Sequence, residues 1–185
     1  MNESAEFIYL GSRLNLRLPF EDNTFDLVIS DQVFEHVLDQ VATFRELHRV
    51  MRLGGHALHV IPAKYRPIEG HTFVPFGNLL PHRGYQKFWA LLGIRNQFQR
   101  GLTANETADH NVFFYVKCTH YVPTSCYKVV WKKLGFEYRF VSQEYFDSHR
   151  RQVMRIVGSL NRVLPIFEVG YRILQSRHAY LVKRA

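Results

Sequence analysis

The stretch that decides the fold is residues 18–55, which read LPFEDNTFDLVISDQVFEHVLDQVATFRELHRVMRLGG. Within this stretch, residues 25–29 are almost entirely apolar, which predicts a strand buried on both faces, as in the middle of a parallel sheet. Residues 56–61 form a second apolar run, which Pro62 ends. Two apolar runs of this length, joined by about 25 residues, predict a strand–helix–strand unit and therefore an α/β fold.

The segment between the two runs has the signals of a helix. Asp39 is a suitable cap for a helix over about residues 40–52, and Gly54 with Gly55 supplies the left-handed backbone that ends such a helix. The side chains that share one helical face are Val41, Phe44, Leu47, His48 and Met51.

Further strands and helices are predicted on both sides of this unit. Residues 7–10, 136–141 and 179–182 are short apolar runs typical of strands. Residues 63–120 form a long excursion with a predicted helix over 85–92 and a second one opened by the capping box of Thr103 and Glu106. Helices are also predicted from Thr124 or Ser125 to Gly135, and over about residues 144–164. Pro165 interrupts the second of these helical stretches.

Composition places the chain among globular proteins. It has 185 residues, of which 46% are hydrophobic and 15% aromatic, enough for one domain with a buried core. Cys118 and Cys126 match no metal or redox spacing, which favours a reducing cytoplasm. The net charge is −4 over residues 1–60 and +12 over residues 61–185. Because the basic residues are scattered, we interpret them as a solvated surface rather than a nucleic-acid site.

Four motifs in order give the chain a family resemblance. They are LPF at 18–20, FDLVIS at 25–30, FEHV at 34–37 and RVMRLGG at 49–55. Together they resemble the class I S-adenosylmethionine-dependent methyltransferases, in particular the small-molecule "type 11" group. This resemblance implies a Rossmann-like sheet of seven strands in the order 3-2-1-4-5-7-6, with helices on both faces. It also implies methyl transfer to a small-molecule, glycan or lipid-linked acceptor.

The matched motifs cover only the later part of that fold. Strands 3, 4, 5, 6 and 7 are placed at residues 7–10, 25–29, 56–61, 136–141 and 179–182, so the expectation is an incomplete sheet in a single partial domain, 1–185. Residues 63–120 are expected to be a helical lid or substrate insertion, and 143–177 a helical insertion between the last two strands. The family's glycine-rich loop and acidic ribose-binding residue have no counterpart, which suggests an N-terminally truncated methyltransferase. We expect these residues alone to bind no measurable cofactor at millimolar concentration.

The resemblance also implies where S-adenosylmethionine would bind. In such sheets the cofactor lies at the carboxyl ends of the strands, where the strand order reverses. The adenine would meet the segment before LPF, where the family often has Asp and this chain has Leu14 or Asn15, depending on register. The expected cofactor-binding residues are Asn15, Leu16, Ser30, Asp31, Gln32 and His36.

The segment after residues 56–61 holds the candidate catalytic and substrate residues. Glu69 and His71 are two residues apart and point the same way if the backbone is extended. His71 is a suitable general base, oriented by Glu69, and Arg66 is suited to an anionic or hydroxylated substrate. Asp31 is the first candidate acid at the tip of the preceding strand. An equally weighted alternative is a polar loop held by its prolines.

The sequence also bears on a metal site and on an association surface. His56 and His59 face opposite sides of a strand, and His71 and His82 have no third ligand at a recognisable spacing, so no metal site is predicted. An amphipathic stretch over 153–167 packs on the core, or else meets a membrane surface. The alternative to an enzyme is a non-catalytic remnant that acts by association, with weak self-association through the strand at 25–29.

Overall fold

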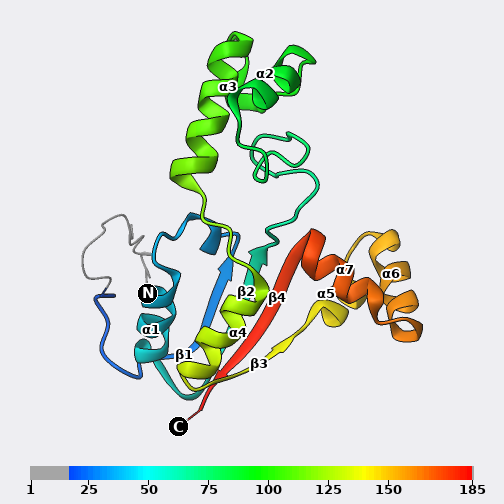
Figure 1. The fold of residues 1–185 in the computed structure, drawn as a ribbon. Helices are drawn as coiled ribbons and strands as arrows, with labels where there is room; N and C mark the ends of the chain where they lie inside the picture. Colours follow the sequence, from blue (N-terminus) through cyan, green and yellow to red (C-terminus); the bar gives the residue numbers. More distant parts are fainter. Residues whose placement is uncertain (1–16, 185) are drawn as a thin grey trace, which may run out of the picture.

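The computed structural model describes residues 17–184, which contain one mixed four-stranded sheet (Figure 1). The strands are β1 (Phe25–Asp31), β2 (Met51–Pro62), β3 (Phe136–Phe140) and β4 (Ser176–Lys183), in the order β1-β2-β4-β3. β1 and β2 are parallel, whereas β4 runs antiparallel to both of its neighbours. The α/β class expected from the sequence is confirmed.

The strand order agrees with the last four places of the expected seven-strand order. β1, β2, β4 and β3 stand where strands 4, 5, 7 and 6 would stand, although the family numbers themselves remain an interpretation. The strand predicted at residues 7–10, and the expected cofactor residues Asn15 and Leu16, lie outside the described residues.

One face of the sheet is covered by α1 (Gln40–Val50) and α4 (Thr124–Lys133), which lie side by side in front of the strands in Figure 1. Trp131 of α4 is fully buried and contacts the rings of Phe44 and Tyr127. This layer holds the main hydrophobic core, which consists of Phe34, Phe44, Met51, Ala57, Ile61, Tyr127, Trp131, Phe136, Ala179 and Leu181.

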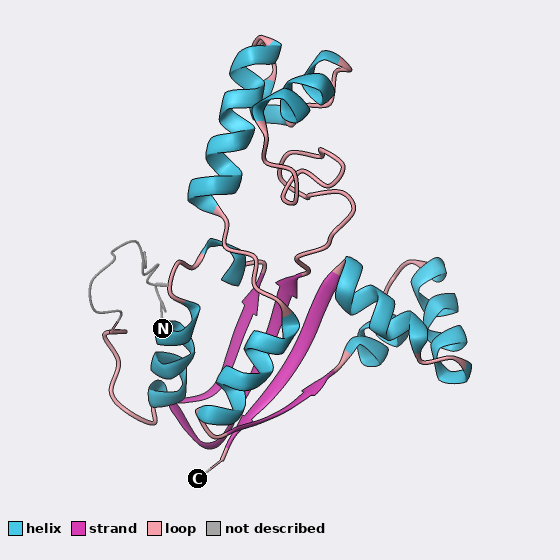
Figure 2. Cartoon of the chain, in the orientation of Figure 1, coloured by secondary structure: helices cyan, strands magenta, loops and turns pink. Residues whose placement is uncertain are grey.

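The opposite face is covered only in part. α5 (Ser142–Ser148), α6 (Gln152–Val163) and α7 (Ile166–Leu174) form a group beside β4 (Figure 2). His178 of β4 lies between Tyr145 and Tyr171 of this group, so helices do lie on both faces of the sheet. The expectation that residues 25–29 are buried on both faces is wrong, because Leu27 and Ile29 are 55% and 65% exposed.

The long excursion after β2 projects from the carboxyl end of β1 and β2. It contains α2 (Arg83–Leu91), α3 (Ala104–Phe113) and a π-helical turn, Phe114–Cys118, and in Figure 2 these elements stand clear of the sheet. The capping box predicted at Thr103 and Glu106 is confirmed, with Thr103 N donating to Glu106 Oε2 at 2.7 Å. None of the helices within residues 17–184 is both long and apolar enough to cross a bilayer.

The end of α1 differs from the prediction. The helix ends at Val50, and Met51 is already extended with φ −76° and ψ 142°. Gly54 does have the left-handed φ of +76°, but it lies inside β2 rather than at the end of the helix. The glycine pair therefore shapes the start of β2, where its pairing with β1 is irregular. The helix stop predicted at Gly135 is confirmed, with a φ of +82°.

Candidate functional site

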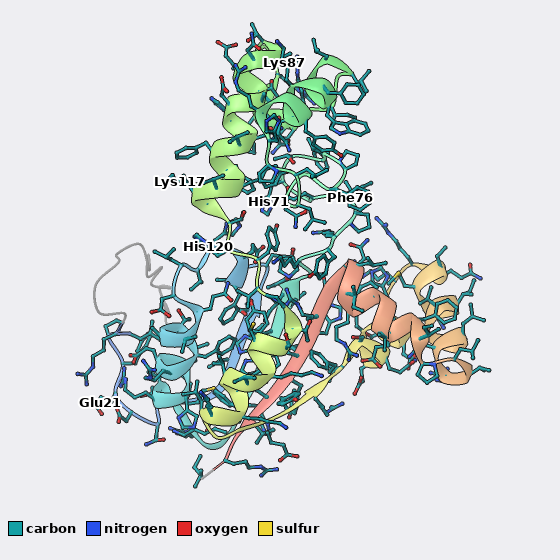
Figure 3. The ribbon with its side chains drawn as sticks, in the orientation of Figure 1. Glu21, His71, Phe76, Lys87, Lys117 and His120 are labelled. Carbon is teal, nitrogen blue, oxygen red and sulfur yellow. The ribbon has the colours of Figure 1, made fainter. Side chains whose placement is uncertain are left out.

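The candidate site lies at the carboxyl ends of β1 and β2. β1 runs into a 3₁₀ turn, Phe34–His36, and β2 runs into the loop of residues 63–82. Figure 3 shows His71 of this loop, and His120 of the segment before α4, between the sheet and the projecting helices. This is the edge of a parallel pair at which α/β proteins bind ligands.

Glu69 is the most densely hydrogen-bonded carboxylate of the site. It is 1% exposed, and its Oε2 accepts from the backbone N–H groups of His71 at 2.7 Å and Thr72 at 2.9 Å. Its Oε1 lies 2.6 Å from His71 Nδ1 and accepts from the Tyr121 hydroxyl at 3.0 Å. Burial opposes ionisation of Glu69, but the hydrogen bonds from His71 and the loop backbone outweigh it and lower the pKa.

His71 is held by Glu69 and remains accessible. Its side chain is 38% exposed, and the hydrogen bond to Glu69 raises the pKa of its imidazole. Because Nδ1 faces a carboxylate, Nδ1 carries the proton in the neutral ring and Nε2 has a free lone pair. The expectation that Glu69 and His71 lie together is therefore met, while the catalytic role of His71 stays a prediction.

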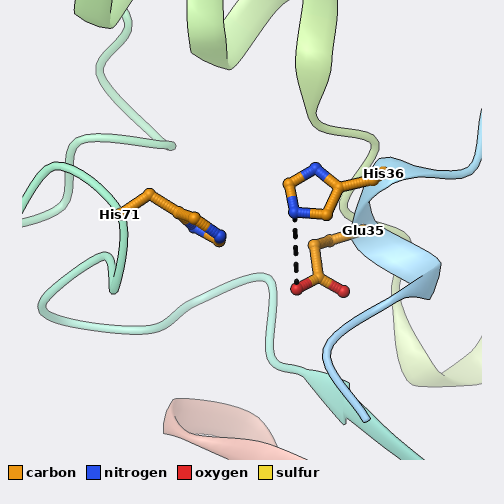
Figure 4. Close-up of side chains that lie close together, drawn as sticks. All are labelled: Glu35, His36 and His71. Carbon is orange, nitrogen blue, oxygen red and sulfur yellow. Dashed lines mark ion pairs between the residues drawn. The ribbon is translucent and has the colours of Figure 1, made fainter. Parts of the chain in front are cut away.

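Glu35 and His36 face His71 from the other side. His36 Nδ1 lies 2.8 Å from the carbonyl oxygen of Cys118, and its Nε2 lies 3.9 Å from Glu35 Oε1. In Figure 4 the rings of His36 and His71 point toward one another, with centroids 5.1 Å apart. Burial raises the pKa of Glu35. One ligand atom from each of Glu35, His36 and His71 lies within 4.8 Å of the others, which is a set that can hold a metal ion.

A cavity of about 1450 Å³ opens beside His71. It lies between the His71 loop, the segment of residues 93–101 and the helix α3 with its π-helical extension. Apolar rings and two arginines contribute to its wall, namely Phe73, Phe98, Phe113, Phe114, Arg95 and Arg100. The space exceeds the roughly 300–1,000 Å³ of a typical small-molecule pocket, so a small organic acceptor would fill only part of it.

The remaining expected residues lie around this centre. Ser30 Oγ is 2.8 Å from Nδ1 of the buried His59, whose pKa burial lowers to about 4. Gln32 follows β1 with a left-handed φ of 52°, which is uncommon for a residue with a side chain and is frequent at functional sites. Asp31 is exposed and pairs with Val60, on the face of the sheet that carries His178.

Arg66 lies at the end of β2 but points toward α7. Its Nε donates to Gln175 Oε1 at 3.1 Å, so in this arrangement its guanidinium is oriented by the residue after α7. It remains close enough to His71 for its charge to act on the imidazole.

Sequence reasoning missed two features of the site. It placed His36 at the cofactor and gave Glu35 no role, whereas the structure brings both to His71. It also missed Tyr121, which donates to Glu69 from 52 positions away. The FEHV motif was the available signal for Glu35 and His36, but no spacing rule connects it to residue 71.

Comparison with known proteins gives the chain a family match. The model described as "Methyltransferase domain" matches residues 5–59. An uncharacterised methyltransferase of Schizosaccharomyces pombe is 52% identical over 40 residues, which are 22% of this chain and 14% of that protein. The resemblance of this stretch to methyltransferases is thereby confirmed, and the chain spans a small part of that curated relative.

Solved structures similar to this fold also include methyltransferases. An S-adenosylmethionine-dependent methyltransferase from Mesorhizobium loti is 13% identical with a TM-score of 0.47, over 90% of this chain and 65% of that one. Phosphoethanolamine N-methyltransferase 2 of Haemonchus contortus, in complex with S-adenosyl-L-methionine, is 12% identical with a TM-score of 0.40, over 90% of this chain and 35% of that one.

Proposed function

We propose that the protein, a methyltransferase-domain relative by the match over residues 5–59, transfers a methyl group from S-adenosylmethionine to an oxygen or nitrogen of an acceptor held in the cavity beside His71. One observation carries the proposal. The strand ends that follow the matched motifs and the Glu69–His71 pair lie at the same edge of the sheet. A cofactor at that edge would present its methyl group close to an acceptor in the cavity.

The proposed roles follow from position. Ser30, Asp31, Gln32 and His36 would contact the cofactor, together with Asn15 and Leu16. His71 Nε2 would accept the proton of the acceptor's nucleophile, while Glu69 holds the ring and stabilises its charged form. Arg66 would contact an anionic group of the acceptor, and Asp31 would be the candidate acid at the tip of β1.

The acceptor is proposed to be a small molecule, a glycan or a lipid-linked compound. Phe98, Phe113 and Phe114 offer apolar contact area, whereas Arg95 and Arg100 favour a negative group. Residues 63–120 would act as the substrate lid, because they supply the wall of the cavity.

His71 is tested by its effect on turnover. Replacing His71 by Ala should lower transfer of the tritiated methyl group from S-adenosylmethionine by about two to four orders of magnitude, the usual worth of a general base. Acceptors from the three classes are offered to the protein produced from its own gene. His56→Ala is the matched control, because His56 bonds Tyr180 on the far side of the sheet. Turnover of His71→Ala within a factor of two of the parent would make His71 a structural residue.

The alternative is a non-catalytic remnant that acts by association. It is favoured by the exposed apolar side chains of Leu27 and Ile29 on β1. Calorimetric titration with S-adenosylhomocysteine separates the two proposals. We expect no saturation at millimolar ligand for the 185 residues alone, and micromolar binding would contradict that expectation. If the protein produced from its own gene neither binds the ligand nor transfers label, only the association module is left.

A further inference from the structure

Three potential ligands from two separate segments meet at one point of the site. Glu35 and His36 belong to the turn after β1, and His71 belongs to the loop after β2. Their ligand atoms lie within 4.8 Å of one another, and Figure 4 shows all three side chains directed into the same space. Two imidazoles and one carboxylate form a donor set used by divalent transition metals.

Both histidines are oriented as metal ligands are. His36 Nδ1 faces the Cys118 carbonyl, which can only accept, so Nδ1 carries the proton and Nε2 keeps its lone pair. His71 Nδ1 is held in the same way by Glu69. In metalloproteins the ring nitrogen that does not bind the metal is usually fixed by a backbone carbonyl or a carboxylate, and these two rings show one case of each.

Glu35 provides an independent observation. Its side chain is 1% exposed, and neither carboxylate oxygen has a hydrogen-bond partner among the described residues. The neighbouring Glu69, equally buried, accepts from two backbone N–H groups and a tyrosine hydroxyl. A buried carboxylate without donors is rare in proteins, because nothing replaces its hydration. A cation between Glu35 and the two imidazoles would replace the hydration that the carboxylate loses on burial.

The cationic side chains nearby are held by other groups. Arg177 donates to the carbonyl oxygens of Val122, at 2.6 Å, and Pro62, and it stacks over the ring of Tyr127. Arg66 donates to Gln175. Neither guanidinium donates to Glu35 in the described part of the chain.

We propose that Glu35, His36 and His71 bind a divalent transition-metal ion of the zinc class, with a fourth position open toward the cavity. With bonds of about 2.0 Å, tetrahedral ligands stand about 3.3 Å apart, so the donors, at most 4.8 Å from one another, need to close by up to roughly 1.5 Å. The His71 loop is the element that would make this movement. The proposal rests on the geometry of these residues and not on methyl transfer.

The ion would change the chemistry of the site. An acceptor hydroxyl that takes the fourth position would lose its proton more readily, because the metal stabilises the resulting oxyanion, and the proton would leave to solvent. His71 Nε2 would then be a ligand rather than a base. Turnover that survives complete chelation of metals would leave His71 in the role of the base.

Direct binding tests the proposal without cofactor or acceptor. Chelator-treated protein is titrated with zinc chloride by calorimetry and with cobalt chloride by visible absorption. We expect one ion per chain and a tetrahedral cobalt spectrum. His36→Ala and His71→Ala should weaken binding by more than the roughly 10–100-fold that Glu69→Gln, which removes an outer partner, should cost. The controls His56→Ala, His82→Ala and Cys126→Ser should bind as the parent does.

Glu35→Gln keeps the proposal falsifiable if the histidine variants unfold. This variant removes a buried carboxylate that accepts no hydrogen bond within residues 17–184, so the metal-free protein should be at least as stable as the parent. Its zinc affinity should nevertheless fall as far as that of the histidine variants. Parent protein that binds no ion, or binding that Glu35→Gln leaves unchanged, would overturn the proposal. Binding that disappears in Cys126→Ser would also overturn it, since it would place the ion on a thiolate.

Discussion

Gly77 packs so closely against Tyr115 that a side chain at this position would collide with the ring. A Cβ on Gly77 would lie 2.7 Å from Tyr115 Cζ and 3.1 Å from Val74 Cβ. Tyr115 also contacts the Thr72 hydroxyl, next to the backbone that binds Glu69. Gly77→Ala should therefore destabilise the fold by about 1–3 kcal/mol, as overpacking does.

The measurement is urea denaturation followed by circular dichroism. Gly170→Ala is the control, because nothing lies within 4 Å of a Cβ there and Gly170 is inside α7. It should stabilise the protein by roughly 0.5–1 kcal/mol through helix propensity. If Gly77→Ala unfolded at the same urea concentration as the parent, the close packing against Tyr115 would be refuted.

At the scale of residues, the sequence predicted contacts between side chains that are close along the chain and missed contacts between distant segments. Glu69 and His71 are two residues apart, so their pairing could be expected, although the structure joins them through a turn, with Phe73 N donating to Glu69 O at 3.0 Å, and not along an extended segment. The approach of Glu35 and His36 depends on how residues 63–82 fold back over the turn after β1. Spacing carries no information about such a fold-back, and the lack of donors to Glu35 within residues 17–184 appears only in the folded structure.

The last turn of α1 anchors the segment that precedes β1. Glu46 Oε1 accepts from Leu18 N at 2.7 Å, and both Glu46 oxygens accept from Arg49 Nε at 3.0 Å. Arg49 also reaches Asp22 at 2.6 Å. The hydrogen bond from Arg49, followed by the one from Leu18, lowers the pKa of Glu46 against the opposing effect of burial. This carboxylate therefore links α1 to residues 18–22.

The pKa shift of Glu46 makes this link dependent on pH. Because the folded-state pKa lies below the ordinary value of 4.5, the stabilisation is fully present above about pH 4.5 and is lost as the pH falls through the lowered pKa. Glu46→Gln should cost about 1.5–3 kcal/mol at pH 7, the range for hydrogen bonds to charged groups. The difference in free energy of unfolding between Glu46→Gln and the parent should become smaller below pH 4.5.

Denaturation of parent and variant at pH 7 and at pH 3.5 measures the difference in free energy of unfolding at each pH. Glu137→Gln is the matched control, because the Glu137–Arg184 pair is more than half exposed and should contribute under about 1 kcal/mol. A gap for Glu46→Gln that stayed constant between the two pH values would contradict the assignment.

The elements themselves were predictable where the local signals are strong. The Thr103–Glu106 capping box and the stop at Gly135 stand where the sequence placed them. The predicted apolar face of α1 was wrong at Val41, which is 46% exposed, because the helix turns its polar Gln40 and Thr43 inward. Gln40 bonds the carbonyl oxygens of Phe34 and His120 and accepts from the Tyr127 hydroxyl. Tertiary hydrogen bonds of this kind override helix amphipathicity.

For the molecule as a whole, the order of the strands could be expected from the family motifs, whereas the solvent exposure of β1 could not. β1 pairs with β2, and within residues 17–184 no strand pairs with its other edge. The α5–α7 group reaches β4 but leaves Leu27 and Ile29 exposed. An apolar run predicts burial only if the covering element is present, and residues 17–184 place none over this part of β1.

The open edge of β1 gives a prediction for the molecule in solution. A strand with unpaired backbone groups and exposed apolar side chains is a template for pairing with another chain. We therefore expect weak self-association of the 185-residue chain through β1, seen in sedimentation velocity as a coefficient that rises with concentration. Ile29→Lys should reduce it, because a lysine on an edge strand opposes pairing. Leu91→Lys, at an equally exposed position on α2, is the control and should leave it unchanged. A single monomeric boundary at every concentration would exclude pairing between copies through β1.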